Sequence, residues 1–127
     1  MAAVRVTSAG GPYAQTIAIR HHTVLADETL EAGGEDRAPT PVELLLGALG
    51  SCVAMTVTMY AGRKGWDVGE VEVELSGRDE AGVYVVERRL TFSAPLTDEQ
   101  RTRLIEIAGR CPVSRRITGT VDIRNVG

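Results

Sequence analysis

The feature that most constrains the fold is a long apolar stretch in the middle of the chain, which opens with strong helix-start signals. Thr40, Pro41 and Glu43 supply an N-cap, a proline at the first helical position and a capping-box acid three residues after the cap. Apolar residues then occur on all sides as far as Tyr60, and glycines follow. The pattern predicts one helix over 41–64, about 36 Å long, whose apolar surface needs cover on more than one side.

This stretch is not typical of a membrane span, because glycines, threonines, Ser51 and Cys52 interrupt it. The chain opens without an apolar segment of signal-peptide length. A length of 127 residues fits a single domain over 1–127, and a net charge of −3 with scattered arginines favours neither nucleic acid nor an anionic membrane as a partner. We therefore expect a single-domain cytoplasmic protein with no nucleic-acid or membrane partner.

Strand patterns flank the long helix on both sides. Loose alternation and β-branched residues predict strands at 13–19 and 23–26, at 71–76 and 83–92 with a turn over 77–82, and at 119–124. Thr97 and Gln100 form a second capping box and predict a helix that carries Leu104 and Ile107. Because helices and strands are segregated rather than alternating, the order predicts an α+β fold with antiparallel sheets around a long central helix.

The two cysteines are the residues best suited to chemistry. Cys52 lies in the middle of the long helix among small residues, where an ordinary buried side chain is the alternative to a reactive thiol. Cys111 lies at a break between helices, where Pro112 can begin a new turn and expose amide groups that favour a thiolate. If the two thiols meet across the core, one can attack an oxidant and the other can condense with the resulting sulfenic acid. An outside dithiol would then reset the pair.

A thiolate in an apolar site needs a cation, and the candidates are Arg20, Arg37 and Arg88. Each is alternatively a solvated surface charge. Arg37, just before the long helix, is preferred over Arg20 and could pair with Glu43. Arg88 shares the phase of the apolar residues of its strand, so it either points inward or marks a bulge.

Glu43 has two readings that can coexist, a helix-capping acid and a catalytic residue. It precedes Cys52 by about 13.5 Å of helical rise, so it would act on that thiol only through an arginine or the substrate. His21 and His22 point to opposite faces of a strand and make a poor metal pair. No glycine-rich phosphate loop is present. We therefore expect neither a metal nor a cofactor.

Two segments carry a family resemblance, GGEDRAPTPVELLLGALGSCVAMTVTMYAGRKGW over 33–66 and IEIAGRCPVSRRI over 105–117. Together they resemble the signature segments of the OsmC/Ohr family of thiol-dependent peroxidases. The resemblance implies an OsmC-like fold, an intertwined homodimer and two active sites at the dimer interface. It further implies that Cys52 is the peroxidatic thiol, that Cys111 is the resolving thiol, and that organic hydroperoxides are the substrates. The best-characterised branch has an arginine-binding glutamate directly after the proline; here Val42 stands there, which suggests the broader OsmC-like branch.

The leading hypothesis is an organic hydroperoxide reductase that uses Cys52 and Cys111, with Arg37 or Arg20 supporting the Cys52 thiolate and Glu43 holding the arginine. A lipoyl-type or thioredoxin-like dithiol would be its reductant. The alternative is a non-enzymatic dimer that binds a small apolar or electrophilic ligand in the same interface pocket, since Val42 replaces the glutamate that would secure the arginine. A third hypothesis is that the cysteines react with other sulfur species or electrophiles.

Overall fold

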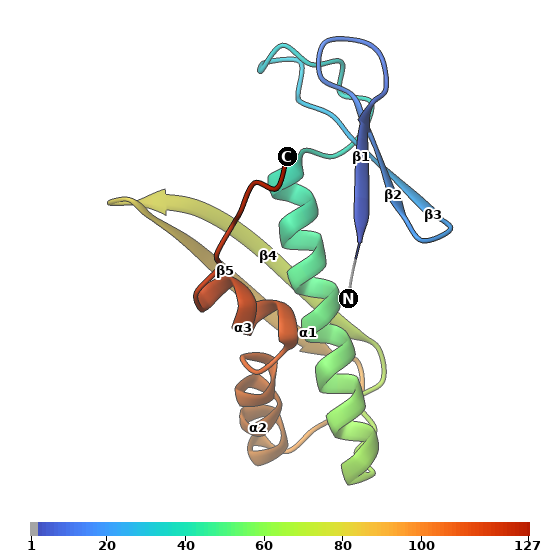
Figure 1. Cartoon of the computed structure of the whole chain (residues 1–127). Coiled ribbons are helices and arrows are strands. Elements are labelled where there is room, and N and C mark those ends of the chain that lie inside the picture. Colours follow the sequence, from blue (N-terminus) through green and yellow to red (C-terminus); the bar gives the residue numbers. More distant parts are fainter. Residues whose placement is uncertain (1–2) are drawn as a thin grey trace. The chain divides into compact units, whose positions relative to one another are not determined.

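The computed structural model describes residues 3–127. The chain divides into two compact units, residues 1–45 and 46–127, and each is described by itself. The fold is α+β with antiparallel sheets and one long helix, as predicted (Figure 1). The assignment of the whole chain to a single domain stays a prediction.

The first unit contains a three-stranded antiparallel sheet in the order β1-β2-β3. Its strands are β1 (Val4–Ser8), β2 (Gln15–Ile19) and β3 (His22–Ala26). The predicted hairpin corresponds to β2 and β3, which pair from Gln15 with Ala26 to Ile19 with His22. The tight turn between them places Arg20 in the left-handed region, with φ of 53°.

Helix α1 (Pro41–Lys64) has the predicted bounds because local signals set both ends. At its start, Thr40 Oγ1 accepts a hydrogen bond from the Glu43 amide, and Glu43 Oε1 accepts one from the Thr40 amide. At its end, Gly65 adopts φ of 71°. The Trp66 amide then bonds back to the Ala61 carbonyl, which is the six-residue closure of a glycine C-cap.

The burial of α1 is one-sided within the single chain, which agrees with the expectation that its apolar surface needs cover on more than one side. Its buried side chains form a stripe at four-residue spacing, Leu49, Val53, Val57 and Ala61. On another side, Met55 and Met59 are each 61% exposed. By length and composition alone α1 could cross a bilayer, a test that the core helix of a soluble protein also passes. The single chain thus leaves much of its apolar surface uncovered.

The second unit also contains the hairpin of β4 (Val71–Glu80) and β5 (Val83–Phe92), followed by α2 (Asp98–Ala108) and α3 (Pro112–Thr118). The predicted turn over 77–82 is wrong, because β4 continues to Glu80 and the turn is only Ala81 and Gly82, both at positive φ. Gly77 stays in the strand, with the Tyr84 ring lying against the place where a side chain would be. An aromatic residue on the partner strand is a known compensation for a strand glycine.

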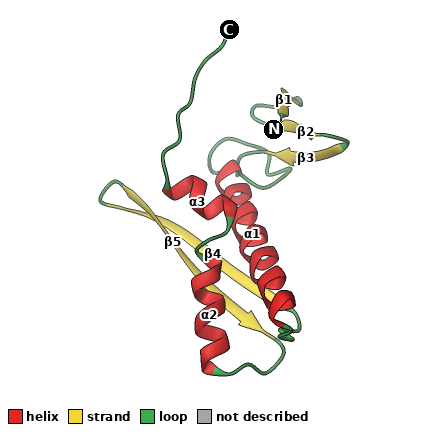
Figure 2. Cartoon of the chain, turned by 60° about the horizontal axis from the view of Figure 1, so that its bottom comes forward, coloured by secondary structure: helices red, strands yellow, loops and turns green. Residues whose placement is uncertain are grey.

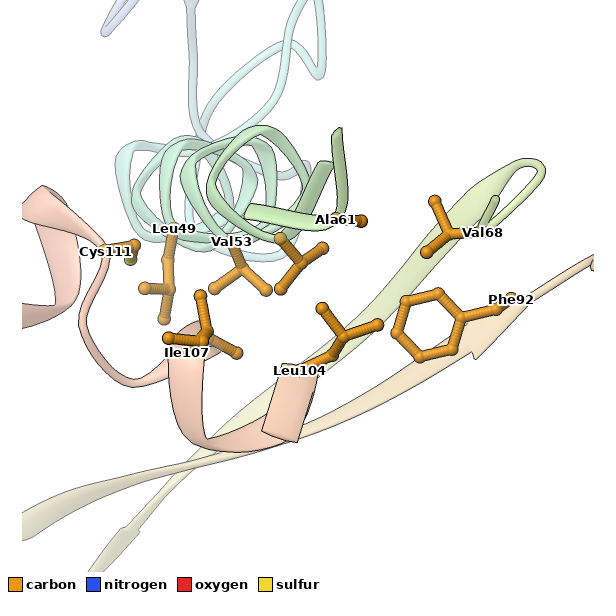
Figure 3. Close-up of a cluster of buried hydrophobic side chains, with 10 residues drawn as sticks. Leu49, Val53, Ala61, Val68, Phe92, Leu104, Ile107 and Cys111 are labelled. Carbon is orange, nitrogen blue, oxygen red and sulfur yellow. The ribbon is translucent and has the colours of Figure 1, made fainter. Parts of the chain in front are cut away.

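One hydrophobic core holds the second unit together. The inward face of β4–β5 packs against α1 and α2 (Figure 2). Val53, Val57 and Leu104 are fully buried in this core. Gly50 lets α1 approach β4 closely, because a Cβ there would lie 2.6 Å from Leu75 Cδ1. Cys111 belongs to this core, and in Figure 3 it lies with Leu49 at one end of the cluster. Core packing therefore brings one of the two candidate thiols into the interior.

The predicted last strand over 119–124 is wrong for the single chain. Residues 119–127 form no strand, and Ile123 is 87% exposed. A strand needs a neighbouring edge with which to hydrogen-bond, and within residues 3–127 none pairs with this segment. The β-branched residues of 119–124 indicate a tendency to form a strand, but not whether a neighbouring strand is present.

Candidate functional site

The structure brings the two cysteines together at the first turn of α3. Cys52 lies in the middle of α1, and Cys111 is the N-cap residue of α3. The Val113 amide donates to Cys52 Sγ at 3.5 Å, and the next amide, that of Ser114, donates to Cys111 Sγ at 3.3 Å. Two thiols that residues 53–110 separate in the sequence thus accept hydrogen bonds from consecutive backbone amides.

Local signals explain why Cys111 occupies this position. Helix α2 ends at Ala108, and Gly109 caps it. Cys111 then adopts an extended conformation, with φ of −64° and ψ of 147°, and Pro112 starts α3 with its fixed φ. The Cys111 sulfur takes the acceptor role that a serine or aspartate oxygen usually has at an N-cap. The new turn after Pro112 that the sequence suggested is present.

The two thiols differ in their access to solvent. Cys111 is fully buried, whereas Cys52 is partly exposed. Burial raises the pKa of the Cys111 thiol above its ordinary value, and the neighbouring Cys52 raises it further. The Ser114 amide and the positive charge of Arg88 act in the opposite direction but do not cancel this. Cys111 is therefore a protonated thiol at neutral pH, and Cys52 is the sulfur that an incoming reagent can reach.

Arg88 points inward, so of its two predicted alternatives the bulge is wrong. The β4–β5 ladder is continuous, and Arg88 pairs with Leu75 on the core-facing side of the hairpin. Its side chain is half-buried. Its Nη2 atom lies 3.6 Å from the position of a Cβ built on Gly109, two residues before Cys111. The sequence named Arg88 as a candidate cation, and the structure places it beside the connection that carries the buried thiol.

Glu43 has the capping role that its position predicted. Its carboxylate binds the Thr40 amide at 2.8 Å and lies exposed on the first turn of α1. Among residues 3–127 it forms no ion pair with Arg20 or Arg37. Val42, at the position of the glutamate in the better-characterised branch, is also exposed. A catalytic role of Glu43 stays a proposal.

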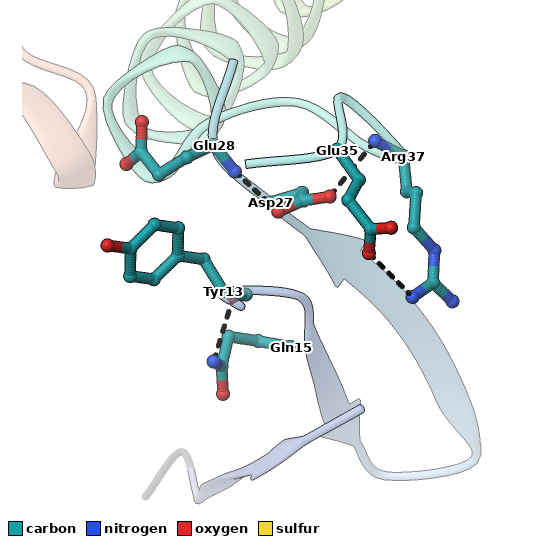
Figure 4. Close-up of polar contacts among 6 residues, drawn as sticks. All are labelled: Tyr13, Gln15, Asp27, Glu28, Glu35 and Arg37. Atoms are coloured by element: carbon teal, nitrogen blue, oxygen red, sulfur yellow. Dashed lines mark hydrogen bonds and ion pairs between the residues drawn. The ribbon is translucent and has the colours of Figure 1, made fainter. Parts of the chain in front are cut away.

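The backbone of Arg37 is held by Asp27 in a loop of the first unit, a contact that the sequence did not predict. The buried Asp27 accepts hydrogen bonds from the amides of Glu28 at 2.7 Å and of Arg37 at 3.1 Å (Figure 4). Chiefly because of the Arg37 amide, the pKa of Asp27 is lowered from its ordinary value. The Arg37 side chain is half-exposed and lies 3.8 Å from Glu35. Asp27 thus holds the backbone of Arg37, while the guanidinium is half-exposed.

Two further observations concern a metal site and the backbone amides that bind the sulfurs. Among residues 3–127, no cluster of three or more histidine, cysteine or acidic side chains could hold a metal ion. The sequence also gave no sign of the Val113 and Ser114 amides as ligands of the sulfurs. The Cys-Pro pair was the available signal, because a residue before an N1 proline is an N-cap whose side chain faces the amides of the first turn.

Comparison with solved structures shows the fold of the whole chain. An OsmC-like protein from Mycoplasma pneumoniae superposes with a TM-score of 0.79 at 14% identity, covering 94% of this chain and 88% of that one. The organic hydroperoxide resistance protein OsmC from Legionella pneumophila gives 0.66 at 20% identity, covering 94% and 92%. An OsmC-like hydroperoxide resistance protein from Jannaschia gives 0.55 at 22% identity, covering 92% and 85%.

The sequence itself gives the family. A search of curated proteins found no match for this chain. The family described as OsmC-like protein matches residues 33–125, which include α1 with Cys52, the β4–β5 hairpin and the turn with Cys111. Since this match spans most of the chain and agrees with the fold, the resemblance predicted from the two segments is confirmed: the chain belongs to the OsmC-like protein family.

Proposed function

We propose that the protein is a thiol-dependent peroxidase that reduces organic hydroperoxides. The observation that carries the proposal is the position of Cys52 and Cys111, whose sulfurs accept hydrogen bonds from adjacent amides of α3. The names of the Legionella and Jannaschia proteins, which mark those proteins as hydroperoxide resistance proteins, support the substrate class. Two neighbouring thiols are also sufficient for a two-electron reduction of an oxidant that ends in a disulfide.

The reaction follows from the two thiols. The Cys52 thiolate attacks the distal oxygen of the hydroperoxide, the O–O bond breaks, and the alcohol leaves after taking up a proton. The Cys52 sulfenic acid that remains is attacked by Cys111, which gives up its proton. A water molecule leaves and the disulfide forms. An external dithiol, lipoyl-type or thioredoxin-like, then reduces the disulfide by exchange. The sum is one hydroperoxide and one dithiol converted to alcohol, water and a disulfide.

The contrast between the thiols supports this division of roles. Cys52 is partly exposed, so a hydroperoxide can reach its sulfur from solvent. Cys111 is buried and its pKa is raised above the ordinary value, so it resists direct oxidation, which requires thiolate character and access. Cys52 is therefore the peroxidatic residue and Cys111 the resolving residue.

Arg37, or Arg20 in its place, is proposed to stabilise the Cys52 thiolate, with Glu43 holding the arginine. Two features of the first unit support Arg37. Its backbone is fixed by Asp27, and within residues 3–127 its half-exposed guanidinium has one ionic contact, to Glu35 at 3.8 Å. Glu43 is exposed, and one carboxylate oxygen serves the Thr40 cap. An acid of this kind can cap the helix and accept from a guanidinium at the same time, because an ionised carboxylate offers several acceptor sites.

The proposed active form is an intertwined cytoplasmic homodimer of one OsmC-like domain. The exposed methionines of α1, Met55 and Met59, support the dimer, since a second copy would cover an apolar surface that one chain leaves open. The unpaired segment 119–127 could hydrogen-bond with an edge of that second copy. Two cysteines are too few for a disulfide framework, which supports a reducing compartment.

The experiment that tests the proposal is the rate at which the reduced protein consumes peroxides, followed by loss of free thiol. Cumene hydroperoxide should react at least about a hundredfold faster than it does with free cysteine, because a preorganised site stabilises the charge that develops in the transition state. Hydrogen peroxide, the polar control oxidant, should react more slowly. A rate equal to that of free cysteine would contradict the peroxidase and favour the alternative, a dimer that binds a small apolar or electrophilic ligand.

A further inference from the structure

Arg88 is an inward-facing cation without an ionic partner in the described chain. It lies on the core side of β5, in the same phase as Val86 and Leu90 and directly opposite Leu75. No carboxylate lies within ion-pair distance of it among residues 3–127, and its guanidinium donates no hydrogen bond there. An arginine in such a position usually has a carboxylate or another partner.

The surroundings of Arg88 explain how it tolerates this position. A pocket of about 220 Å³ on the hairpin is lined by Arg88 together with Leu75, Glu74 and Glu87. Water in this pocket can solvate part of the guanidinium, which lowers the cost of leaving it unpaired. Glu87 does not compete for Arg88, because it pairs with Arg78 at 2.8 Å. The positive charge of Arg88 can therefore interact with groups on the core side of β5.

What lies on that side is the connection between α2 and α3. The Nη2 atom of Arg88 is 3.6 Å from a Cβ built on Gly109, so the guanidinium approaches the backbone just before the resolving thiol. A Cβ at Gly109 would be in van der Waals contact with the guanidinium. Burial of Cys111 disfavours its thiolate. The ionisable groups that act on Cys111 are Cys52 from α1, which opposes the thiolate, and Arg88 from β5, which favours it.

We propose that Arg88 stabilises the Cys111 thiolate at the moment when Cys111 attacks the oxidised sulfur of Cys52. In this role Arg88 is a positioning residue for the resolving step and takes no part in the attack on the hydroperoxide. The inference rests on the proposed function, because it assumes that Cys111 resolves an oxidised Cys52. It assigns separate roles to two arginines. Arg37 or Arg20 stabilises the Cys52 thiolate, as proposed above, and Arg88 stabilises the Cys111 thiolate.

The test uses 2,2′-dithiodipyridine, a neutral disulfide, so that neither a peroxide nor the charge of the probe enters the result. The Cys52 thiolate attacks a sulfur of the probe, the probe disulfide breaks, and one thiopyridone leaves. Cys111 then loses its proton and attacks the Cys52 sulfur of the mixed disulfide, a second thiopyridone leaves, and the intramolecular disulfide forms. The first phase of thiopyridone absorbance reports Cys52, and the second reports Cys111.

The variants are Arg88→Met, Arg88→Gln and Arg88→Lys, with Arg89→Gln as the matched control on the neighbouring exposed position. Loss of the charge is expected to raise the pKa of Cys111 by about one unit, which lowers the thiolate fraction about tenfold. A thiolate of higher pKa is about threefold more nucleophilic, so the net slowing of the second phase is about threefold. Its half-maximal pH should move up by about one unit. The first phase should be unchanged within about twofold.

Arg88→Lys should restore most of the second-phase rate, whereas Arg89→Gln should leave both phases at the wild-type rate. A structural role alone would slow Arg88→Lys as much as Arg88→Met. Thermal unfolding of all four variants checks their folding, and either neutral variant that folds suffices. The proposal is overturned if a folded neutral variant keeps the wild-type second phase and its pH profile. If the phases behave as expected but no peroxide is consumed, then Arg88 is assigned correctly and the peroxidase is wrong.

Discussion

The Cys52→Ser variant is expected to lose at least about a thousandfold of its turnover of organic hydroperoxides, since removal of a reacting nucleophile costs about that much or more in other covalent enzymes. A serine hydroxyl stays protonated at neutral pH and does not cleave the O–O bond. The loss should appear in the dithiol-coupled assay and equally in a single turnover without reductant, because the first chemical step is missing. The measurement is the rate of cumene hydroperoxide consumption.

Ser51→Ala is the matched control for this variant. Ser51 is exposed and adjoins Cys52 on α1, and its hydroxyl donates to the Gly47 carbonyl of the preceding turn at 2.8 Å. Its replacement removes a hydroxyl from the same helix turn and leaves the sulfur untouched, so turnover should stay within about twofold of wild type. More than a tenth of wild-type turnover in a folded Cys52→Ser protein would mean that another group attacks the peroxide.

The second large effect is expected for Cys111→Ser, which separates the first chemical step from the second. Serine is a good N-cap and can accept the Ser114 amide as the sulfur does, so α3 should form normally. The variant should reduce one equivalent of hydroperoxide and stop at the Cys52 sulfenic acid. Mass spectrometry should then show one added oxygen, and two with excess oxidant, as sulfinic acid forms.

Steady-state turnover of Cys111→Ser should fall at least about tenfold at millimolar thiol, because an external thiol replaces an intramolecular one of far higher effective concentration. The rate of the first oxidation should match that of the wild type. Wild-type steady-state turnover in this variant would assign resolution to another thiol, and a slow first oxidation would mean that Cys111 acts before Cys52 is oxidised.

The elements that could be predicted from the sequence are those whose signals are local. Thr40, Pro41 and Glu43 define the start of α1 within four residues, and Gly65 defines its end, so both bounds are as predicted. The capping box of Thr97 and Gln100 is also present. Gly77 led to the wrong prediction of a turn because glycine is common in turns. The Tyr84 ring that covers it across the hairpin is known only from the structure.

Features that depend on contacts between distant segments could not be predicted from the sequence. The residues of 119–124 have a strand pattern, but no edge within residues 3–127 pairs with them. The exposure of Met55 and Met59 depends likewise on what covers α1, which periodicity does not describe. In each case the prediction lacked the position of the neighbouring segment.

The candidate site was partly accessible to prediction. Both cysteines were named, and their meeting was stated as a condition because residues 53–110 separate them. The structure meets that condition through the turn at Pro112. Among the candidate cations, Arg88 is turned inward by the hairpin register and lies beside the connection that carries Cys111, whereas Arg20 and Arg37 belong to the first unit, which is described by itself. The inward direction of Arg88 depends on the register of the β4–β5 hairpin, which the sequence pattern left open.

The measurement that tests the central claim most directly is the intact mass of the fully reduced wild-type protein after one equivalent of cumene hydroperoxide, read under denaturing conditions. The expected product is a monomer lighter by two hydrogen atoms, with no thiol left to alkylate and a peptide map that joins Cys52 to Cys111. A monomer of unchanged mass, a gain of oxygen with Cys111 still free, or a disulfide-linked dimer would contradict it.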